Sequence, residues 1–160
     1  MGEKVTNVVF AGLGGQGVLK ASDILAEAVF RCGFDVKKSE IHGMSQRGGS
    51  VSSDVRFGEE VFSPMVPKGQ ADFLVVLAAE QIETNQAVLK PGGTLIAPDA
   101  VSEEKLPHPR TINIALLGVL SRHLSIPEET WLATVKASLP ENLHEINERA
   151  FRLGQTGGSA

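Results

Sequence analysis

The stretch Gly12-Leu13-Gly14-Gly15-Gln16-Gly17 decides the fold, because it joins an apolar run to a helical pattern. Residues 5–13 are rich in valine and other apolar side chains, which is typical of a central parallel strand covered on both faces. Residues 18–32 repeat apolar side chains every three or four positions, and Gly33 follows as a helix-ending residue. The sequence therefore predicts a strand, a tight glycine turn and a helix.

The glycine turn has the spacing Gly-x-Gly-x-x-Gly of dinucleotide-binding proteins. Glycine permits positive φ and leaves backbone amides open to an anion, whose charge the N-terminus of a helix favours. The same turn also serves strand-to-helix packing with nothing bound, so both interpretations stay open at this point. If a cofactor phosphate binds here, the candidate cofactor-binding residues are Gly12, Gly14, Gly15, Gln16 and Gly17.

The length of 160 residues and mass of 17.0 kDa fit one domain, which we place at residues 1–153, with a flexible glycine-rich tail at 154–160. A net charge of −4 without a run of Lys or Arg argues against nucleic acid as a partner. No apolar run approaches the roughly 20 residues that span a bilayer, and the N-terminus lacks a signal-peptide pattern. We therefore expect no membrane contact and a cytoplasmic location.

The pattern departs from a dinucleotide-binding fold after the second strand, which is expected at residues 34–41. A second glycine loop follows at 42–50 in place of a helix and leads into residues 51–57, whose alternating side chains predict a half-covered strand. Residues 58–59 would turn the chain into a return strand at 60–62. We therefore expect a parallel strand–helix–strand unit followed by a β-hairpin insertion.

The remaining chain predicts two more strands and several helices. The expected elements are a buried parallel strand at 71–78, a short helix from Glu80, a glycine cap and turn at 90–93, a strand at 94–97, and helices from Thr111, Ser125 and Ser138. The last two helices follow capping boxes, in which a serine side chain caps the first amides. The fold class is α/β, with a Rossmann-like mostly parallel sheet, helices on both faces, the β-hairpin insertion and C-terminal helices.

The sequence contains no recognisable metal-binding or nucleophile motif. The four histidines are scattered, and none has a histidine or cysteine three or four residues away, so no metal site is expected. No Gly-x-Ser-x-Gly segment is present. Cys32 lies at the end of the first predicted helix on its apolar stripe, which predicts a buried, inert thiol. As the only cysteine, it cannot hold an iron–sulfur cluster, which needs about four ligands.

Two regions outside the glycine turn carry side chains suited to binding. Glu40 ends the second predicted strand, where an acidic residue would contact a ribose hydroxyl in a dinucleotide site. The alternative, which the hairpin insertion favours, is that Glu40 only holds the loop after it. That loop carries His42, Gln46 and Arg47, candidate assisting residues that could bind an anion or a partner's carboxylate. Its alternative is a surface turn whose glycines merely permit sharp bends.

Together the two glycine loops closely resemble the gamma subunit, or gamma domain, of the 2-oxoacid:ferredoxin oxidoreductases, and within that group the beta subunit of indolepyruvate ferredoxin oxidoreductase. The residues that carry the resemblance are 12–18, 40–51, Ser53-Asp54-Val55-Arg56, Ala71-Asp72 with Glu80, Lys90-Pro91-Gly92-Gly93 and Asn113-Ile114-Ala115-Leu116-Leu117-Gly118. They extend over nearly the whole chain. The segment 99–110 departs from the pattern, because relatives usually carry more chain there.

The resemblance implies a subunit of a complex that converts a 2-oxoacid, here indolepyruvate or another aryl pyruvate, to an acyl-CoA by oxidative decarboxylation. It implies thiamine diphosphate, Mg and [4Fe-4S] clusters on one or more catalytic partner subunits, CoA as a substrate, and ferredoxin as the electron acceptor of the complex. It implies no cofactor bound by this chain alone. The chain lacks both a Gly-Asp-Gly segment followed by asparagines for the magnesium ion and a cysteine set for clusters. We therefore expect the isolated chain to be inactive.

Two other functions stay open on the sequence. The glycine spacing and Glu40 motivate a stand-alone dinucleotide-binding oxidoreductase. A third hypothesis is a stand-alone protein that binds CoA or a nucleotide. All three place the ligand or partner at the two glycine loops, which follow the carboxyl ends of the first two strands, where open α/β sheets hold their ligands.

Overall fold

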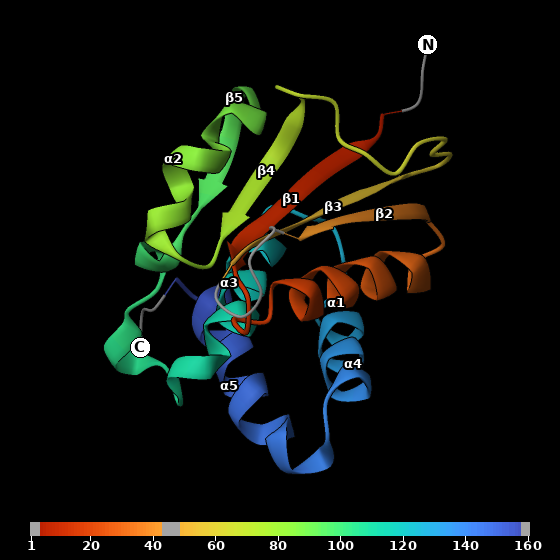
Figure 1. Ribbon diagram of the computed structural model, residues 1–160. Helices are drawn as coiled ribbons and strands as arrows, with labels where there is room; N and C mark the ends of the chain where they lie inside the picture. Colours follow the sequence, from red (N-terminus) through yellow and green to blue (C-terminus); the bar gives the residue numbers. More distant parts are fainter. Residues whose placement is uncertain (1–3, 43–48, 158–160) are drawn as a thin grey trace.

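The computed structural model describes residues 4–42 and 49–157, and its centre is a five-stranded sheet in the order β2-β3-β1-β4-β5 (Figure 1). The strands are β1 (Thr6–Leu13), β2 (Asp35–His42), β3 (Ser50–Gly58), β4 (Ala71–Val76) and β5 (Leu89–Ile96). β4 pairs in parallel with β1 and β5, whereas β3 pairs antiparallel with both β1 and β2. β2 therefore runs in the same direction as β1, and the prediction of a mostly parallel sheet is confirmed.

The structure contains a β-hairpin, but β2 and β3 form it, and not residues 51–57 with the predicted return strand. β3 pairs with the strand before it, from Asp35 opposite Gly58 to His42 opposite Val51. The predicted return strand at 60–62 is wrong, because the structure has no strand between β3 and β4. As a result β3 lies between β1 and β2, which run parallel to each other as predicted.

Two aspartate side chains of the sheet hold the segment 59–70, which forms no strand pairing. The backbone amide of Val61 donates to Asp35 Oδ2 over 2.7 Å, and the amide of Val66 donates to Asp54 Oδ2 over 2.8 Å. Burial raises the pKa of the Asp54 carboxyl above its usual value, although the Val66 amide and the nearby Arg56 charge lower it. These amides bond to carboxylates instead of strand carbonyls, so the segment crosses the sheet without pairing.

Helices cover the two faces of the sheet unequally. The long helices α1 (Val18–Arg31), α3 (Ile112–Ser121), α4 (Glu128–Ser138) and α5 (His144–Gln155) lie together on one side, below the sheet in Figure 1. The short α2 (Ile82–Asn85) follows β4. Single 3-10 turns complete the fold: η1 (Ala79–Gln81), η2 (Gln86–Val88), η3 (Pro98–Ala100), η4 (Glu103–Lys105), η5 (Pro109–Thr111) and η6 (Glu141–Leu143).

Two apolar clusters correspond to the two faces, because successive side chains of a strand point to opposite sides. Val8 and Phe10 of β1 belong to the large cluster under the long helices, which also contains the fully buried Trp131. Val9 and Ala11 belong to a small cluster on the other face. That cluster is covered by side chains of the 59–70 segment, α2 and η2, namely Val66, Ile82 and Val88. Helices therefore cover both faces, as predicted.

Several predicted element boundaries differ from the structure. Residues 90–93 belong to β5, where an irregularity in the pairing with β4 takes the place of the predicted helix cap. The serine caps are absent from α4 and α5, and Ser138 Oγ instead donates to the carbonyl of Thr134 within α4. Helix α5 continues through Gln155 with Gly154 buried, although both residues were assigned to the tail. Gly154 is held there because its backbone packs against α3.

Helix α1 begins at Val18 as predicted, but Cys32 lies beyond its last turn. The helix ends at Arg31, and Cys32 is a free, exposed cysteine. The predicted buried thiol is wrong, because the apolar stripe of α1 ends before this residue and the chain turns toward β2. Among the described residues, no helix has the length and apolar character needed to cross a membrane.

Candidate functional site

The glycine turn connects the carboxyl end of β1 to the first turn of α1. Gly15 and Gly17 have φ values of +89° and +85°, in the left-handed region that favours glycine. Gly17 is the N-cap residue of α1, so no side chain caps the first amides of this helix. The first turn also contains no acidic residue. The helix therefore presents uncompensated N–H groups at this end of the sheet.

Gln16 closes the turn with its side chain. The amide of Leu13 donates to Gln16 Oε1 over 2.7 Å, and Gln16 Nε2 donates to the carbonyl of Leu77 over 3.4 Å. The Leu77 amide donates in turn to the carbonyl of Ala11 in β1 over 2.8 Å. Gln16 thus ties the turn to the chain that leaves β4. Both ends of its amide already have partners, which makes its role here a positioning one.

Two glycines of the turn are required for packing. A Cβ atom on Gly12 would lie 2.8 Å from Val18 Cγ2 and 2.9 Å from Gln16 Oε1, closer than real Cβ contacts. A Cβ on Gly17 would overlap the side-chain amide of Asn113. Asn113 is buried at the start of α3, and its Nδ2 donates to the Gly17 carbonyl over 3.3 Å. The turn is therefore held from β1, β4 and α3 together.

A backbone hydrogen bond joins the two glycine loops. The amide of Gly14 donates to the carbonyl of Gly49 over 2.8 Å, directly before β3 begins at Ser50. The second loop leaves β2 at His42 and returns onto the glycine turn at Gly49. The prediction that the loops form one surface is supported by this contact. Because the Gly14 amide already has an acceptor, it is unavailable to a phosphate.

The three predicted assisting residues belong to the second loop. The His42 backbone pairs with Val51, while its side chain lies outside the described residues. Gln46 and Arg47 also lie outside the described residues. The described ends of this loop are β2 and Gly49, and Gly49 contacts the glycine turn.

A hollow of about 300 Å³ lies beside the turn, at the amide end of α1. Its lining includes Gly14, Gly15, Gly17, Lys20 and Val51. Lys20 Nζ donates to the carbonyl of Ser138 over 3.1 Å and is exposed. An ammonium group and the first amides of a helix both favour negative charge, so this hollow suits a small anion or a carboxylate.

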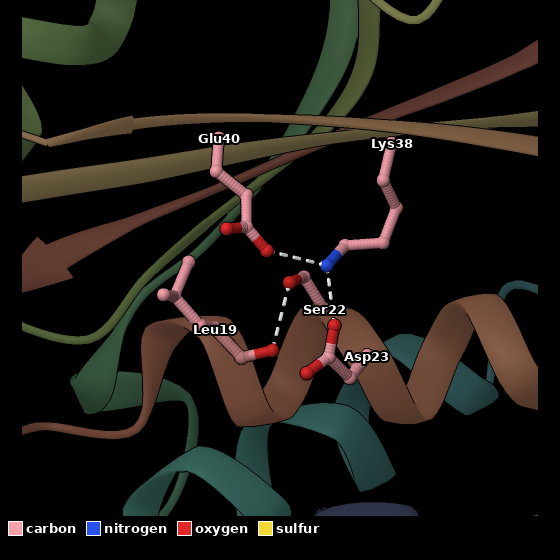
Figure 2. A network of polar contacts seen from close by, with 5 residues as sticks. All are labelled: Leu19, Ser22, Asp23, Lys38 and Glu40. Carbon is pink, nitrogen blue, oxygen red and sulfur yellow. Dashed lines mark hydrogen bonds and ion pairs between the residues drawn. The ribbon is translucent and has the colours of Figure 1, made fainter.

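Glu40 lies away from the glycine turn, in a polar network shown in Figure 2. Lys38 Nζ forms ion pairs with Glu40 Oε2, over 2.7 Å, and with Asp23 of α1. Burial alone would lower the pKa of the Lys38 ammonium, but the hydrogen bonds and charges of both carboxylates outweigh it and raise that pKa. Since β3 separates β2 from β1, Glu40 is not beside the glycine turn, as a ribose-binding carboxylate would be.

Asn113 belongs to the site but was not among the residues predicted for it from sequence patterns. It belongs to the Asn113-Ile114-Ala115 motif of the family resemblance, and the structure shows its contact with Gly17. Its Oδ1 accepts from the Ile114 amide over 2.9 Å. A buried asparagine that opens an apolar helix was the available signal, because buried amides require specific hydrogen-bond partners.

These features define an α/β domain whose glycine turn, at the carboxyl end of β1, is held by β1, α3, the chain after β4 and Gly49. The chain belongs to the pyruvate ferredoxin/flavodoxin oxidoreductase family, whose sequence pattern matches residues 7–156.

Relatives of known function agree with this assignment. The chain is 35% identical to the indolepyruvate oxidoreductase subunit IorB of Thermococcus kodakarensis, over 94% of this chain and 95% of the relative. Its fold matches the gamma subunit of a keto/oxoacid ferredoxin oxidoreductase from Geobacter sulfurreducens PCA, with a TM-score of 0.80 and 25% identity over 97% of each chain. A 2-oxoglutarate:ferredoxin oxidoreductase from Magnetococcus marinus has the same fold within a longer chain, with a TM-score of 0.83, 21% identity, and coverage of 98% of this chain and 31% of that one.

The residues of this chain do not fit the iron–sulfur clusters of a ferredoxin-dependent oxidoreductase. A [4Fe-4S] cluster needs about four thiolates, and the sequence has one cysteine, at the exposed end of α1. In residues 4–42 and 49–157, no group of three or more His, Cys, Asp or Glu side chains could hold a metal ion. The described residues of the site can accordingly contribute packing, amide donors and charge.

Proposed function

We propose that this chain is the gamma-type subunit of a 2-oxoacid:ferredoxin oxidoreductase that acts on indolepyruvate or another aryl pyruvate. The 35% identity to an indolepyruvate oxidoreductase subunit supports the substrate class. In this proposal the catalytic subunits hold thiamine diphosphate, Mg and the [4Fe-4S] clusters. Those subunits convert the 2-oxoacid and CoA to an acyl-CoA and pass the electrons to ferredoxin, while this chain alone has no turnover.

The hydrogen bond between Gly14 and Gly49 carries this proposal. It uses a turn amide that a dinucleotide phosphate would need, and it joins the described end of the second loop, at Gly49, to the turn. Gly12, Gln16 and Gly17 are already committed to contacts with α1, β4 and α3. The turn is thus a rigid base for the second loop, and we assign to His42, Gln46 and Arg47 the contact with the catalytic subunit or its CoA side.

The variant Arg47→Ala tests this assignment. We expect an unchanged melting temperature of the isolated chain, because the sequence predicts Arg47 in a loop. We also expect a loss of complex formation or turnover of about tenfold or more, the size of one charge-assisted contact. The measurement is co-purification with co-expressed thiamine- and cluster-bearing subunits, followed by 2-oxoacid-dependent reduction of ferredoxin. Lys68→Ala, which removes an exposed cation from the 59–70 segment, serves as the control.

Two outcomes would contradict the assignment. The first is an Arg47→Ala chain that unfolds while its partner contact stays normal. The second is a wild-type chain that never co-purifies with a thiamine-dependent subunit.

The hollow beside α1 favours a second candidate function, a stand-alone protein that binds a dinucleotide, CoA or another nucleotide. Calorimetry of the isolated chain with NAD, FAD and CoA separates the candidates. Under the subunit proposal we expect no tight binding of NAD or FAD. Tight binding of either dinucleotide by the isolated chain would favour the second function and count against the first.

A further inference from the structure

A second and larger cavity, of about 560 Å³, lies between the start of α3 and the start of α5. From its lining we infer that this cavity binds an aromatic monocarboxylate whose ring carries an N–H donor. The volume falls in the range of sites for organic ligands, roughly 300–1,000 Å³, and exceeds what a small inorganic ion fills. None of the residues used below belongs to the glycine turn or the second loop.

One end of the cavity offers hydrogen-bond donors. The backbone amide of Arg110 donates to His108 Nδ1 over 3.1 Å, so the neutral His108 ring carries its proton on Nε2. The Thr111 hydroxyl and amide both donate to the His108 carbonyl, over 2.5 Å and 2.9 Å, and fix this turn. The exposed Arg110 guanidinium has no side-chain partner among the described residues. A guanidinium and an imidazole N–H at one edge suit a carboxylate.

A buried acceptor lines the same cavity. Asn147 of α5 is only 6% exposed, and its Nδ2 donates to the Leu143 carbonyl over 2.9 Å. Its Oδ1 accepts no hydrogen bond within the described part of the chain, yet it is not enclosed by protein like the buried unpaired atoms of Ser53 and Trp131. Because Asn147 lines the cavity, we assign its Oδ1 as the acceptor there, and a ligand N–H would satisfy it.

Aliphatic side chains from three segments form the rest of the wall. Ile114 belongs to α3, Leu139 follows α4, and Ile146 belongs to α5. His144 Nε2 lies 2.8 Å from the Leu139 carbonyl and fixes that segment against α5. An apolar wall, two donor side chains and one buried acceptor suit a ring that has a carboxylate side chain and a ring N–H.

Binding of indole-3-acetate to the full chain tests this inference. We expect one molecule to bind per chain by calorimetry, with amide shifts in NMR spectra at the starts of α3 and α5. Indole lacks the carboxylate and naphthalene-1-acetate lacks the N–H, so each should bind about tenfold more weakly or worse. Equal affinity of all three compounds would overturn the inference, as would shifts confined to the glycine turn or no binding at millimolar concentration.

The variant Arg110→Gln keeps an exposed polar side chain and should fold. We expect it to weaken indole-3-acetate about tenfold while leaving indole unchanged, because only the carboxylate contact is lost. Arg149→Gln, which changes an exposed arginine of α5 outside this cavity, should affect neither compound. An Arg110→Gln chain that binds indole-3-acetate as well as the wild type would contradict the site.

The inference rests on the proposed function only for the choice of an indole ring as the probe. Its test uses the isolated chain and a stable acid that undergoes no turnover. Failure of this test leaves co-purification with a catalytic subunit unaffected, and failure to co-purify leaves the cavity binding unaffected, so the two proposals fail separately.

Discussion

Gly17 is the residue at which the turn, the first helix and α3 meet. Its φ of +85° already disfavours other residues, and the Asn113 side chain occupies the space that a Cβ would need. Gly15 has a similar φ of +89°, but a Cβ there would meet nothing within 4 Å. Substituting each glycine in turn therefore separates the free-energy cost of a left-handed backbone from the free-energy cost of a lost contact.

This comparison gives a prediction at the scale of one residue. Gly15→Ala should lower the free energy of unfolding by about 1–2 kcal/mol, the cost of a left-handed alanine. Gly17→Ala should lower it by about 1–2 kcal/mol more, because Asn113 must move and lose its bond to the Gly17 carbonyl. Urea unfolding of the two variants measures the difference. Equal losses of unfolding free energy in the two variants would show that the Asn113 side chain moves aside without cost.

The sequence pattern located the glycine turn but did not predict the hydrogen bonds that its atoms form. The spacing of Gly12, Gly14 and Gly17 marked a strand-to-helix turn, which the structure confirms. The bonds of Gln16 to Leu77 and of Gly14 to Gly49 depend on chain segments far away in sequence, so no local pattern contains them.

At the scale of elements, α3 and α5 pack backbone against backbone. A Cβ on Gly118 would overlap the Phe151 carbonyl, and a Cβ on Gly154 would overlap the Ala115 carbonyl. Both contacts involve backbone atoms, which cannot rotate aside as a side chain can. The pair of glycines therefore sets how closely the two helices approach.

We predict that Gly154→Ala lowers the free energy of unfolding by about 2 kcal/mol or more, since the helices must separate along their contact. Arg149→Ala, an exposed position on the same helix, should stay within about 0.5 kcal/mol of the wild type. Chemical denaturation provides both values. A Gly154→Ala chain as stable as the wild type would show that α5 can shift without cost.

The Lys38 network ties α1 to the edge strand β2 (Figure 2). Because the pKa of Lys38 is raised in the folded chain, its stabilising effect is complete below the ordinary value of 10.5 and is lost as pH rises through the folded pKa above it. We predict that Lys38→Met lowers stability by less than about 1 kcal/mol at pH 8, since solvent screens part of the network. The difference from the wild type should shrink above pH 10.5.

Thermal melts between pH 8 and pH 11.5 check this prediction. Lys37→Met serves as the control, because Lys37 pairs with Asp35 of its own strand, over 3.8 Å, and forms no ion pair with α1 among the described residues. A Lys38→Met difference that is constant across this pH range would rule out an ionic contribution.

Element types were predictable where the apolar period was long, as in β1, α1, β4 and α3. Pairing was less predictable. The alternation in 51–57 correctly indicated a strand, yet its partners β1 and β2 follow from tertiary contacts and not from the Gly58-Glu59 turn signal. The serine boxes marked two real helices, although the α4 serine bonds within the helix instead of capping one.

For the whole molecule, one large apolar cluster connects the sheet to all four long helices. Trp131, the only tryptophan, is fully buried there, with its ring centroid 5.6 Å from that of Phe151. We predict that tryptophan fluorescence, which reports the helical layer, and far-ultraviolet circular dichroism, which reports the whole backbone, give the same denaturation midpoint. Two separated midpoints would mean that the helical layer unfolds independently of the sheet.

For the whole molecule, the sequence predicted that the two glycine loops meet beside the carboxyl end of β1, and the described ends of these loops are joined by the Gly14–Gly49 bond. The binding roles of the loop residues stay predictions. Sequence patterns did not predict the cavity between the starts of α3 and α5, because His108, Arg110 and Asn147 come from segments that share no motif.

The insertion of β3 between β1 and β2 also determines the order in which the sheet can assemble during synthesis. When the ribosome has released residues 4–42, the first two strands and their helix exist, but these strands have no ladder to form with each other. Residues 50–58 must emerge and enter between them before either edge is paired. Until then the nascent chain exposes two strands that lack their shared partner, and such unpaired edges are open to non-native pairing.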